Sequence, residues 1–227
     1  MSKQIHLQAD DGHAFQAWCA APDSPPRGAV VIVQEVFGVN QHIRQVCERF
    51  AGEGYLAVAP ALYDRVERDC ELPYGPEGVA RGIAIRKQIS DALALRDLAA
   101  AIAYVGEQRG VAESGVGVIG FCWGGTLAWL AATRLAGIDA AVCYYGTGIA
   151  GYVSEQPGVP VMLHFGEQDK NIPAADVELI ESRHPDLEVF RYPAGHGFNC
   201  DDRPAYDAAS ASQAMARTLR LLSETLG

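Results

Sequence analysis

Short continuous runs of apolar residues recur along the chain and are typical of strands buried inside a sheet. The clearest is Ala29 to Gln34, AVVIVQ, in which β-branched residues follow one another without polar alternation. A strand of this composition is buried on both faces, as in a parallel sheet covered by helices. The same pattern predicts strands over 5–8, 15–20, 29–34, 55–59, 140–145, 159–165 and 187–192, and one that ends at Gly120.

Between these runs, apolar residues recur at helical spacing. Residues 41–52 place their apolar side chains on one face, which predicts an amphipathic helix. Further helices are predicted over 126–135, 174–183 and 204–226, and the stretch 81–107 is long enough for two. The stretch 61–79 contains prolines and a glycine near its end and is expected to be irregular.

Strand and helix alternate at least four times, which indicates an α/β fold with a mostly parallel central sheet and helices on both faces. No linker or internal repeat interrupts the pattern, so residues 1–227 are expected to form one domain. In such sheets ligands bind at the carboxyl ends of the strands. Functional residues are therefore expected directly after strands.

The overall charge narrows the range of partners. Of the 227 residues, 28 are acidic and 18 are Lys or Arg, which gives a net charge of -10. This argues against nucleic acid and anionic membranes as partners, but a small anionic substrate could still be held by local arginines. With no signal-peptide or membrane-spanning stretch, we expect a cytoplasmic protein, either a monomer or a weak homo-oligomer.

Six cysteines are spread along the chain without regular spacing. In a chain without a secretion signal, free thiols are expected rather than disulfides. No cysteine and histidine lie at the spacing of metal ligands, so neither a metal site nor any other cofactor is predicted. Of the histidines outside the motifs below, His164 is expected in the core with a hydrogen-bond partner, and His42 and His184 at the surface.

Three residues suited to nucleophilic catalysis each follow a predicted strand. Cys122 lies in Gly120-Phe121-Cys122-Trp123-Gly124, between a strand and a helix, and Asp169 and His196 follow two later strands. Nucleophile, acid and histidine in this order, with the nucleophile in a Gly-x-nucleophile-x-Gly elbow, indicate the α/β-hydrolase fold. The sequence therefore predicts a Cys-His-Asp triad.

The chemistry explains why these residue types are needed. The glycines let strand and helix approach closely while the nucleophile stands clear of the sheet, and the positive end of the helix points at the sulfur. His196 would shuttle the proton and Asp169 would orient the imidazole. Backbone N–H groups of Val36 and Trp123 are expected to form the oxyanion hole.

Each of these residues also has a plainer interpretation. Cys122 could be a buried thiol and His196 a loop histidine. Asp169 could cap the helix that begins after Ile172, and nearby Asp176 competes with it for the role of the acid.

Several motifs together resemble the dienelactone hydrolase family, the carboxymethylenebutenolidases, over nearly the whole chain. They are Gln34-Glu35-Val36-Phe37-Gly38, Val58-Ala59-Pro60-Ala61-Leu62-Tyr63, Gly120 to Gly125, Tyr144-Tyr145-Gly146 and Gly195-His196-Gly197-Phe198. The resemblance implies that Cys122 opens an enol-lactone through an acyl-enzyme that water then hydrolyses. It also implies that Glu35 interacts with the resting thiol and helps to generate the thiolate; otherwise Glu35 is an ordinary loop carboxylate.

The resemblance further implies a substrate carboxylate held by arginines. Arg81 lies in the corresponding region, and Arg203 is the arginine nearest to the histidine motif, where Cys200 occupies the neighbourhood of the family's second arginine. Phe37 and Tyr145 flank the motif corners and are candidates for lining the pocket. Both arginines could instead be solvated surface residues, and both aromatic residues could be packing.

Other functions remain open from the sequence. The same triad would serve a general carboxylesterase or thioesterase acting on neutral esters. A non-catalytic member of the fold could bind a small ligand, or could sense redox conditions through an exposed Cys122 with Cys200 near it in space.

Overall fold

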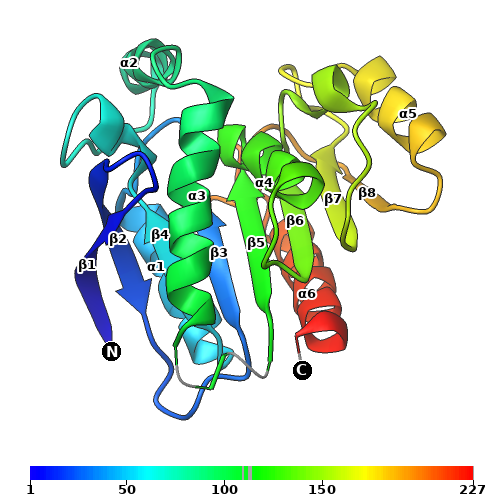
Figure 1. Ribbon diagram of the computed structural model, residues 1–227. Coiled ribbons are helices and arrows are strands. Elements are labelled where there is room, and N and C mark those ends of the chain that lie inside the picture. The colour runs from blue at the N-terminus through cyan, green and yellow to red at the C-terminus, as the bar shows by residue number, and fades with distance from the viewer. Residues whose placement is uncertain (109, 112–113, 227) are drawn as a thin grey trace.

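The central feature of the computed structural model is a twisted sheet of eight strands (Figure 1). The structure describes residues 1–108, 110–111 and 114–226. The strands lie in the order β1-β2-β4-β3-β5-β6-β7-β8. They are β1 (Ser2–Gln8), β2 (Ala14–Ala20), β3 (Ala29–Val33), β4 (Leu56–Pro60), β5 (Val116–Phe121), β6 (Ala140–Tyr144), β7 (Val161–Gly166) and β8 (Glu188–Tyr192).

The sheet is mostly parallel, as predicted. β1 and β2 form an antiparallel edge, and β3 to β8 run parallel to one another. β3 and β5 lie at the centre, and all their residues are buried. Their continuous apolar sequence is explained by this position, because each strand meets helices on both faces.

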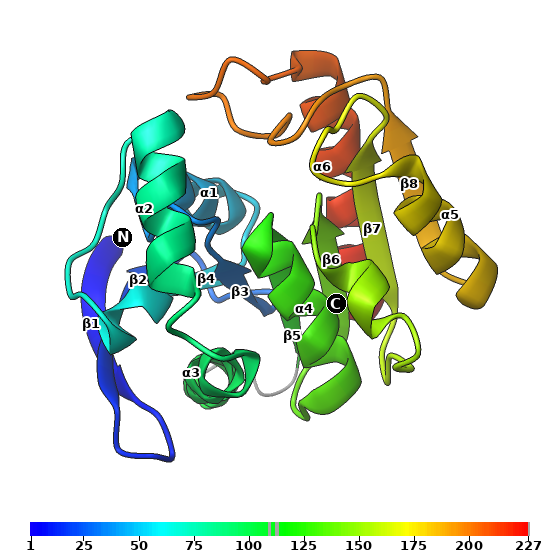
Figure 2. The same ribbon diagram turned by 90° about the horizontal axis from the view of Figure 1, so that it is seen from above.

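Helices cover both faces of the sheet. Figure 2 shows α1 (Gln41–Gly52) and α6 (Ala208–Thr225) on one face, and α3 (Asp91–Gly106) and α4 (Trp123–Arg134) on the other. α5 (Ala174–Arg183) lies beside β8. None of the described helices has the length and apolar composition needed to cross a membrane.

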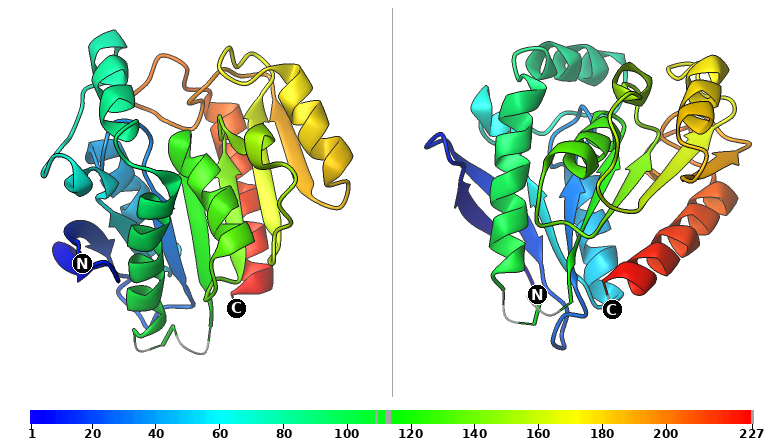
Figure 3. Two further views of the ribbon diagram at one scale, coloured as in Figure 1. Left: turned by 45° about the horizontal axis from the view of Figure 1, so that its top comes forward. Right: turned by 45° about the vertical axis from the view of Figure 1, so that its right-hand side comes forward.

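The carboxyl ends of the parallel strands carry α2 (Pro76–Arg86), at the top of Figure 1. The segment between β8 and α6, orange in Figure 3, crosses the same edge. The register aligns Val33 with Gly120 and Phe121 with Tyr144. The residues that follow β3, β5 and β6 therefore meet at one edge of the sheet.

Several boundaries differ from the sequence prediction, whereas the expectation that 81–107 holds parts of two helices is confirmed. The stretch expected to be irregular contains a 3₁₀ turn, η1 (Leu62–Arg65), and the first turn of α2, which begins at Pro76 because proline fits the first helical position. The predicted stretch 81–107 holds the end of α2 and a separate helix, α3, whose first turn is capped by Ser90. α6 begins at Ala208 rather than at Pro204. Its N-cap is Asp207, whose carboxylate accepts from the Ser210 N–H at 2.8 Å.

Two histidines expected at the surface are buried. His42 is 0% exposed on the inner face of α1, and His184 is 6% exposed, where it ends α5. His164 lies in the core, as expected, with its Nδ1 2.8 Å from the Tyr192 hydroxyl.

Candidate active site

Cys122 lies at a strained corner between β5 and α4. Its φ of 56° and ψ of -115° place a non-glycine residue in the left-handed half of backbone space. A Cβ on Gly120 would lie 1.8 Å from the Gly124 carbonyl oxygen, and one on Gly124 would lie 2.3 Å from that of Val33. Only glycine fits at both positions, which explains the elbow spacing and leaves the Cys122 side chain partly exposed.

His196 connects the two other predicted catalytic residues. Its Nδ1 lies 2.7 Å from Oδ2 of the buried Asp169, and the ring lines the same cavity as Cys122. Burial opposes the charged imidazole, but the contacts with Asp169 and Cys122 prevail and raise the pKa of His196 to about 10. The imidazolium form is therefore favoured at neutral pH.

Asp169 uses its two carboxylate oxygens separately. Oδ2 contacts His196, whereas Oδ1 accepts from the Asn171 N–H at 2.8 Å. Asp169 thus has both roles that the sequence suggested: Oδ1 accepts from a backbone N–H, as a capping residue would, and Oδ2 pairs with His196. The N-cap of α5 itself is Pro173, so Asp169 stabilises the turn before the helix.

Glu35 is buried directly after β3 and pairs with an arginine. It is 1% exposed, and its Oε1 lies 3.0 Å from Nη1 of Arg203. Its Oε2 is buried without a hydrogen-bond partner among the described residues. The Arg203 guanidinium also lies over the rings of Phe37 and Tyr74, at 5.6 and 5.8 Å.

Burial disfavours the charge of Arg203, but the Glu35 carboxylate outweighs this and raises the pKa of the guanidinium. Arg203 and Glu35 thus form a largely buried salt bridge next to the cavity. The resemblance implied a contact between Glu35 and the Cys122 thiol, and the contact that the structure gives Glu35 is with Arg203.

The two expected oxyanion donors border the space next to Cys122. Trp123 is the first residue of α4, where backbone N–H groups have no partner within the helix. Val36 belongs to the turn after β3, and α2 fixes this turn by close packing. A Cβ on Gly82 of α2 would lie 1.8 Å from the Val36 carbonyl oxygen.

A cavity of about 290 Å³ opens above the Cys122 side chain. Six predicted site residues line it: Val36, Phe37, Cys122, Trp123, His196 and Arg203. Val79, Ile83, Arg86, Thr147 and Asn171 complete its wall. Asp169 is absent from this lining because it contacts the far side of the His196 ring.

Arg81 and Tyr145 lie outside that wall. Arg81 has a side chain 58% exposed and pairs with Glu67 at 2.6 Å. Tyr145 is 0% exposed, and its ring packs under His196 with a centroid distance of 5.0 Å. It supports the histidine rather than bordering the cavity.

Arg86 was not among the residues predicted from the sequence, and α2 brings it to the cavity beside Cys122. Its guanidinium lies 5.9 Å from the centre of the Trp123 ring, and within the described residues it forms no ion pair. Arg86 could have been found only from its position at the end of α2, the helix that crosses the carboxyl edge of the sheet. The sequence does not show where α2 begins and ends, so this position could not be used.

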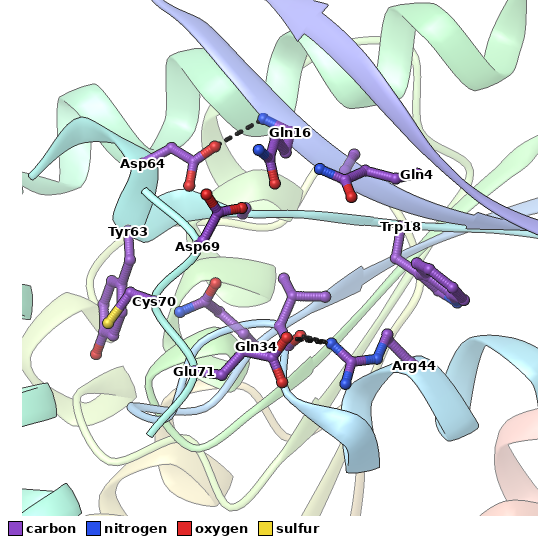
Figure 4. Close-up of a pocket in the computed structure, with 13 residues that line it drawn as sticks. Gln4, Gln16, Trp18, Gln34, Arg44, Tyr63, Asp64, Asp69, Cys70 and Glu71 are labelled. Atoms are coloured by element: carbon purple, nitrogen blue, oxygen red, sulfur yellow. Dashed lines mark hydrogen bonds and ion pairs between the residues drawn. The ribbon is translucent and has the colours of Figure 1, made fainter. Parts of the chain in front are cut away.

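A second hollow of about 140 Å³ lies at the same edge, toward β1 and β2 (Figure 4). Gln34 and Tyr63 form part of its wall, and the Tyr63 ring stacks on Trp123 at 5.9 Å. The lining is polar, with Asp64 accepting from the Gln16 N–H at 2.8 Å and Arg44 paired with Glu71. The three predicted catalytic side chains do not border this hollow.

These features define the class of protein. A mostly parallel eight-stranded sheet with an antiparallel edge, covered by helices on both faces and with a strained elbow after its central strand, is an α/β-hydrolase fold. The chain belongs to the dienelactone hydrolase family, whose model matches residues 15–226. It is therefore a hydrolase.

Known relatives support both statements. The "Putative carboxymethylenebutenolidase" of Synechocystis sp. is 40% identical over 212 residues, which cover 87% of this chain and 86% of the relative. The "Carboxymethylenebutenolidase" of Pseudomonas putida is 34% identical and covers 98% and 97%. The crystal structure of a "Putative Dienelactone Hydrolase" from Klebsiella pneumoniae has a TM-score of 0.84 and 30% identity, and covers 98% and 99%.

Proposed function

We propose that this protein hydrolyses small esters or enol-lactones through a thioester at Cys122. The main support is the position of His196, which pairs with the buried Asp169 carboxylate and borders the same open cavity as Cys122. This is the arrangement of a nucleophile, a general acid–base and the group that orients it. The model of the family and the names of the relatives agree with the reaction class.

The proposed reaction has two halves. The Cys122 sulfur attacks the carbonyl carbon, the carbon–oxygen bond of the ester breaks, and the His196 imidazolium gives its proton to the departing oxygen. His196 then accepts a proton from water, the hydroxide attacks the thioester, and the sulfur leaves as the carboxylic acid is released. The raised pKa of His196 favours the imidazolium form that the first half requires.

Negative charge on the carbonyl oxygen is stabilised in both halves by the N–H groups of Trp123 and Val36. The removal of one such donor costs about 2.7–4 kcal/mol of transition-state stabilisation in other enzymes. Because these donors belong to the backbone, the Val36 side chain can be replaced with little effect on the chemistry.

The wall of the cavity supports a small substrate with one anionic group. Val36, Phe37, Val79 and Ile83 offer apolar surface. Arg203 is neutralised by Glu35, so Arg86 is the guanidinium in the described wall that no carboxylate pairs with. A substrate carboxylate would lie against Arg86, with its ester group over Cys122.

A general carboxylesterase is the second candidate. The apolar wall favours it, and so does the position of Arg81, which pairs with Glu67 away from the cavity. The redox-sensing alternative has less support, because Cys200 is 0% exposed and its burial raises the pKa of the thiol.

Steady-state hydrolysis of cis- and trans-dienelactone, beside a neutral aryl ester of similar size, tests the proposal. We expect the wild type to open dienelactone and the Cys122→Ala variant to lose roughly 10⁴-fold or more in turnover while keeping its fold. Turnover of the aryl ester alone would assign the protein to the general carboxylesterases. An unchanged rate in Cys122→Ala would disprove the role of the nucleophile.

A further inference from the structure

The segment between β8 and α6 brings two functional groups to the cavity, His196 and Arg203. Its internal hydrogen bonds are local: the Cys200 N–H donates to Gly197, the Arg203 N–H to Cys200 and the Asp207 N–H to Phe198. These bonds define the shape of the segment. The start of the segment is joined to the turn after β7, where the Gln168 N–H donates to the Ala194 carbonyl oxygen at 2.9 Å. Beyond Phe198, the contacts with α1 and with Glu35 that are described below come from side chains.

Asp201 connects this segment to α1 through both of its carboxylate oxygens. Oδ1 lies 3.2 Å from Nδ1 of His42, and Oδ2 lies 2.5 Å from Nη2 of Arg49. His42 and Arg49 are seven residues apart, about two helical turns, so one face of α1 presents both groups. In Figure 2 the segment, shown in orange, extends from α6 toward α1.

The two partners of Asp201 differ in exposure. His42 is 0% exposed and packs against the ring of Phe121, the residue before Cys122, with a centroid distance of 6.5 Å. Arg49 has a side chain 42% exposed. The enclosed imidazole therefore supplies a fixed point, and the guanidinium supplies the balancing positive charge.

The ionised state of Asp201 is favoured by these neighbours. Partial burial opposes its charge, but the Arg49 guanidinium, with a smaller contribution from His42, lowers the pKa of Asp201 overall. His42, Asp201 and Asp202 also lie close enough to ligate a metal ion, with ligand atoms within 4.8 Å of one another. The Arg49 guanidinium already supplies a positive charge at Asp201. We therefore interpret His42, Arg49 and Asp201 as an ion-paired contact that joins the segment to α1.

Arg203 tolerates little displacement. It lies two residues beyond Asp201 and runs directly over Gly197, where a Cβ would lie 2.3 Å from Nη1 of Arg203. Its guanidinium is confined by the rings of Phe37 and Tyr74. A small shift of the segment would therefore separate Arg203 from Glu35.

We infer that Asp201 is a positioning residue that, held by His42 and Arg49, keeps Arg203 against Glu35 beside Cys122. It touches no substrate and acts through Arg203. Its effect on turnover rests on the proposed function, but its effect on the charge near Cys122 does not. This second effect can be measured without any substrate.

The test compares the alkylation of Cys122 by iodoacetate, an anion, with its alkylation by iodoacetamide, a neutral molecule of nearly the same size. Arg203 neutralises the Glu35 carboxylate near the sulfur, so Arg203→Gln leaves that carboxylate uncompensated. The uncompensated charge repels the anion, and the ratio of the iodoacetate rate to the iodoacetamide rate is expected to fall several-fold. Asp201→Ala is expected to lower this ratio in the same direction. Asp202→Ala removes an equal charge one residue away and is expected to leave the ratio unchanged.

The double variant Asp201→Ala/Arg203→Gln identifies the route of the effect. If Asp201 acts through Arg203, the double variant has the ratio of Arg203→Gln alone, because groups that act as a unit are not additive. In turnover, Asp201→Ala is expected to raise KM for an anionic ester by roughly tenfold relative to Asp202→Ala, within the usual range of such coupling.

Three results would overturn the inference: equal ratios in Asp201→Ala and the wild type, equal shifts in Asp201→Ala and Asp202→Ala, or additive shifts in the double variant. A loss of melting temperature without a change in the ratio would leave Asp201 with a structural role only and would also refute it. Failure of the proposed function is recognised separately, by unchanged turnover in Cys122→Ala.

Discussion

The elbow around Cys122 and the cavity wall formed by α2 lie at the same edge of the sheet but are built in different ways. Gly120, Cys122 and Gly124 are close in sequence, and backbone contacts with the neighbouring strand determine their geometry. Arg86 and Ile83 reach the cavity from a helix that follows an irregular stretch. Backbone contacts thus position the proposed nucleophile, whereas side chains from a separate helix form the wall that would contact the substrate.

The largest effect is expected at the backbone-determined centre. Asp169→Asn leaves an amide that cannot support the same tautomer and charge of His196, so kcat/KM should fall by roughly 10³- to 10⁴-fold. The matched control is Asp176→Asn, on the first turn of α5, which should retain full activity. Equal losses in the two variants, measured on the same ester, would contradict the assignment of the acid.

The His196 pair also predicts a pH dependence of stability. Its pKa is raised from 6.5 to about 10 in the folded protein, so the pair stabilises fully below pH 6.5 and its contribution disappears as the pH rises through 10. We expect the free energy of unfolding to fall by a few kcal/mol between these limits. Chemical denaturation at several pH values should show a much flatter profile for His196→Gln than for the wild type.

The backbone contacts at the elbow predict that an alanine substitution at Gly124 lowers the stability of the fold far more than one at Gly106. In Gly124→Ala the new Cβ meets the Val33 carbonyl oxygen, which should destabilise the fold by about 1–3 kcal/mol and disturb Cys122. Gly106→Ala, at the end of α3 with open space around the new methyl group, should leave stability unchanged or raise it by up to ~1 kcal/mol. Urea unfolding of both variants checks this; similar stabilities would mean that the elbow can relax.

The smallest expected effect concerns the wall on α2. Arg86→Gln should raise KM for an anionic ester by about tenfold, equivalent to about 1.4 kcal/mol, and leave a neutral ester unaffected. Arg81→Gln, on the same helix, should change neither value, because that side chain pairs with Glu67 outside the cavity. An equal response of the two esters to Arg86→Gln would favour a general carboxylesterase.

Much of the fold follows from local pattern, since each strand and the elbow are determined by residues near one another in sequence. All eight predicted strands are present, and the position of Cys122 between β5 and α4 is confirmed. The burial of His42 was missed, although it lies four residues before Val46 on the apolar face of α1. Its partner Asp201 comes from a distant segment and could not be predicted from the pattern of α1.

The choice between Arg81 and Arg86 depends on helical phase. Five residues along a helix correspond to about 140° of rotation, so the two arginines point in different directions. Without the start of α2 at Pro76, the sequence cannot decide which of them faces the cavity. The residues that would bind the substrate were therefore harder to predict from the sequence than Cys122, Asp169 and His196.

The separation of α2 from the elbow has an evolutionary consequence. Insertions or deletions between η1 and α2 can rotate or slide that helix over the cavity while leaving Cys122, Asp169 and His196 in place. Changes of loop length that keep Gly82 packed on Val36 can therefore alter the substrate range while the elbow stays intact. For directed evolution, residues 66–75 are the place to vary length, and the glycines of the elbow are the place to forbid any change.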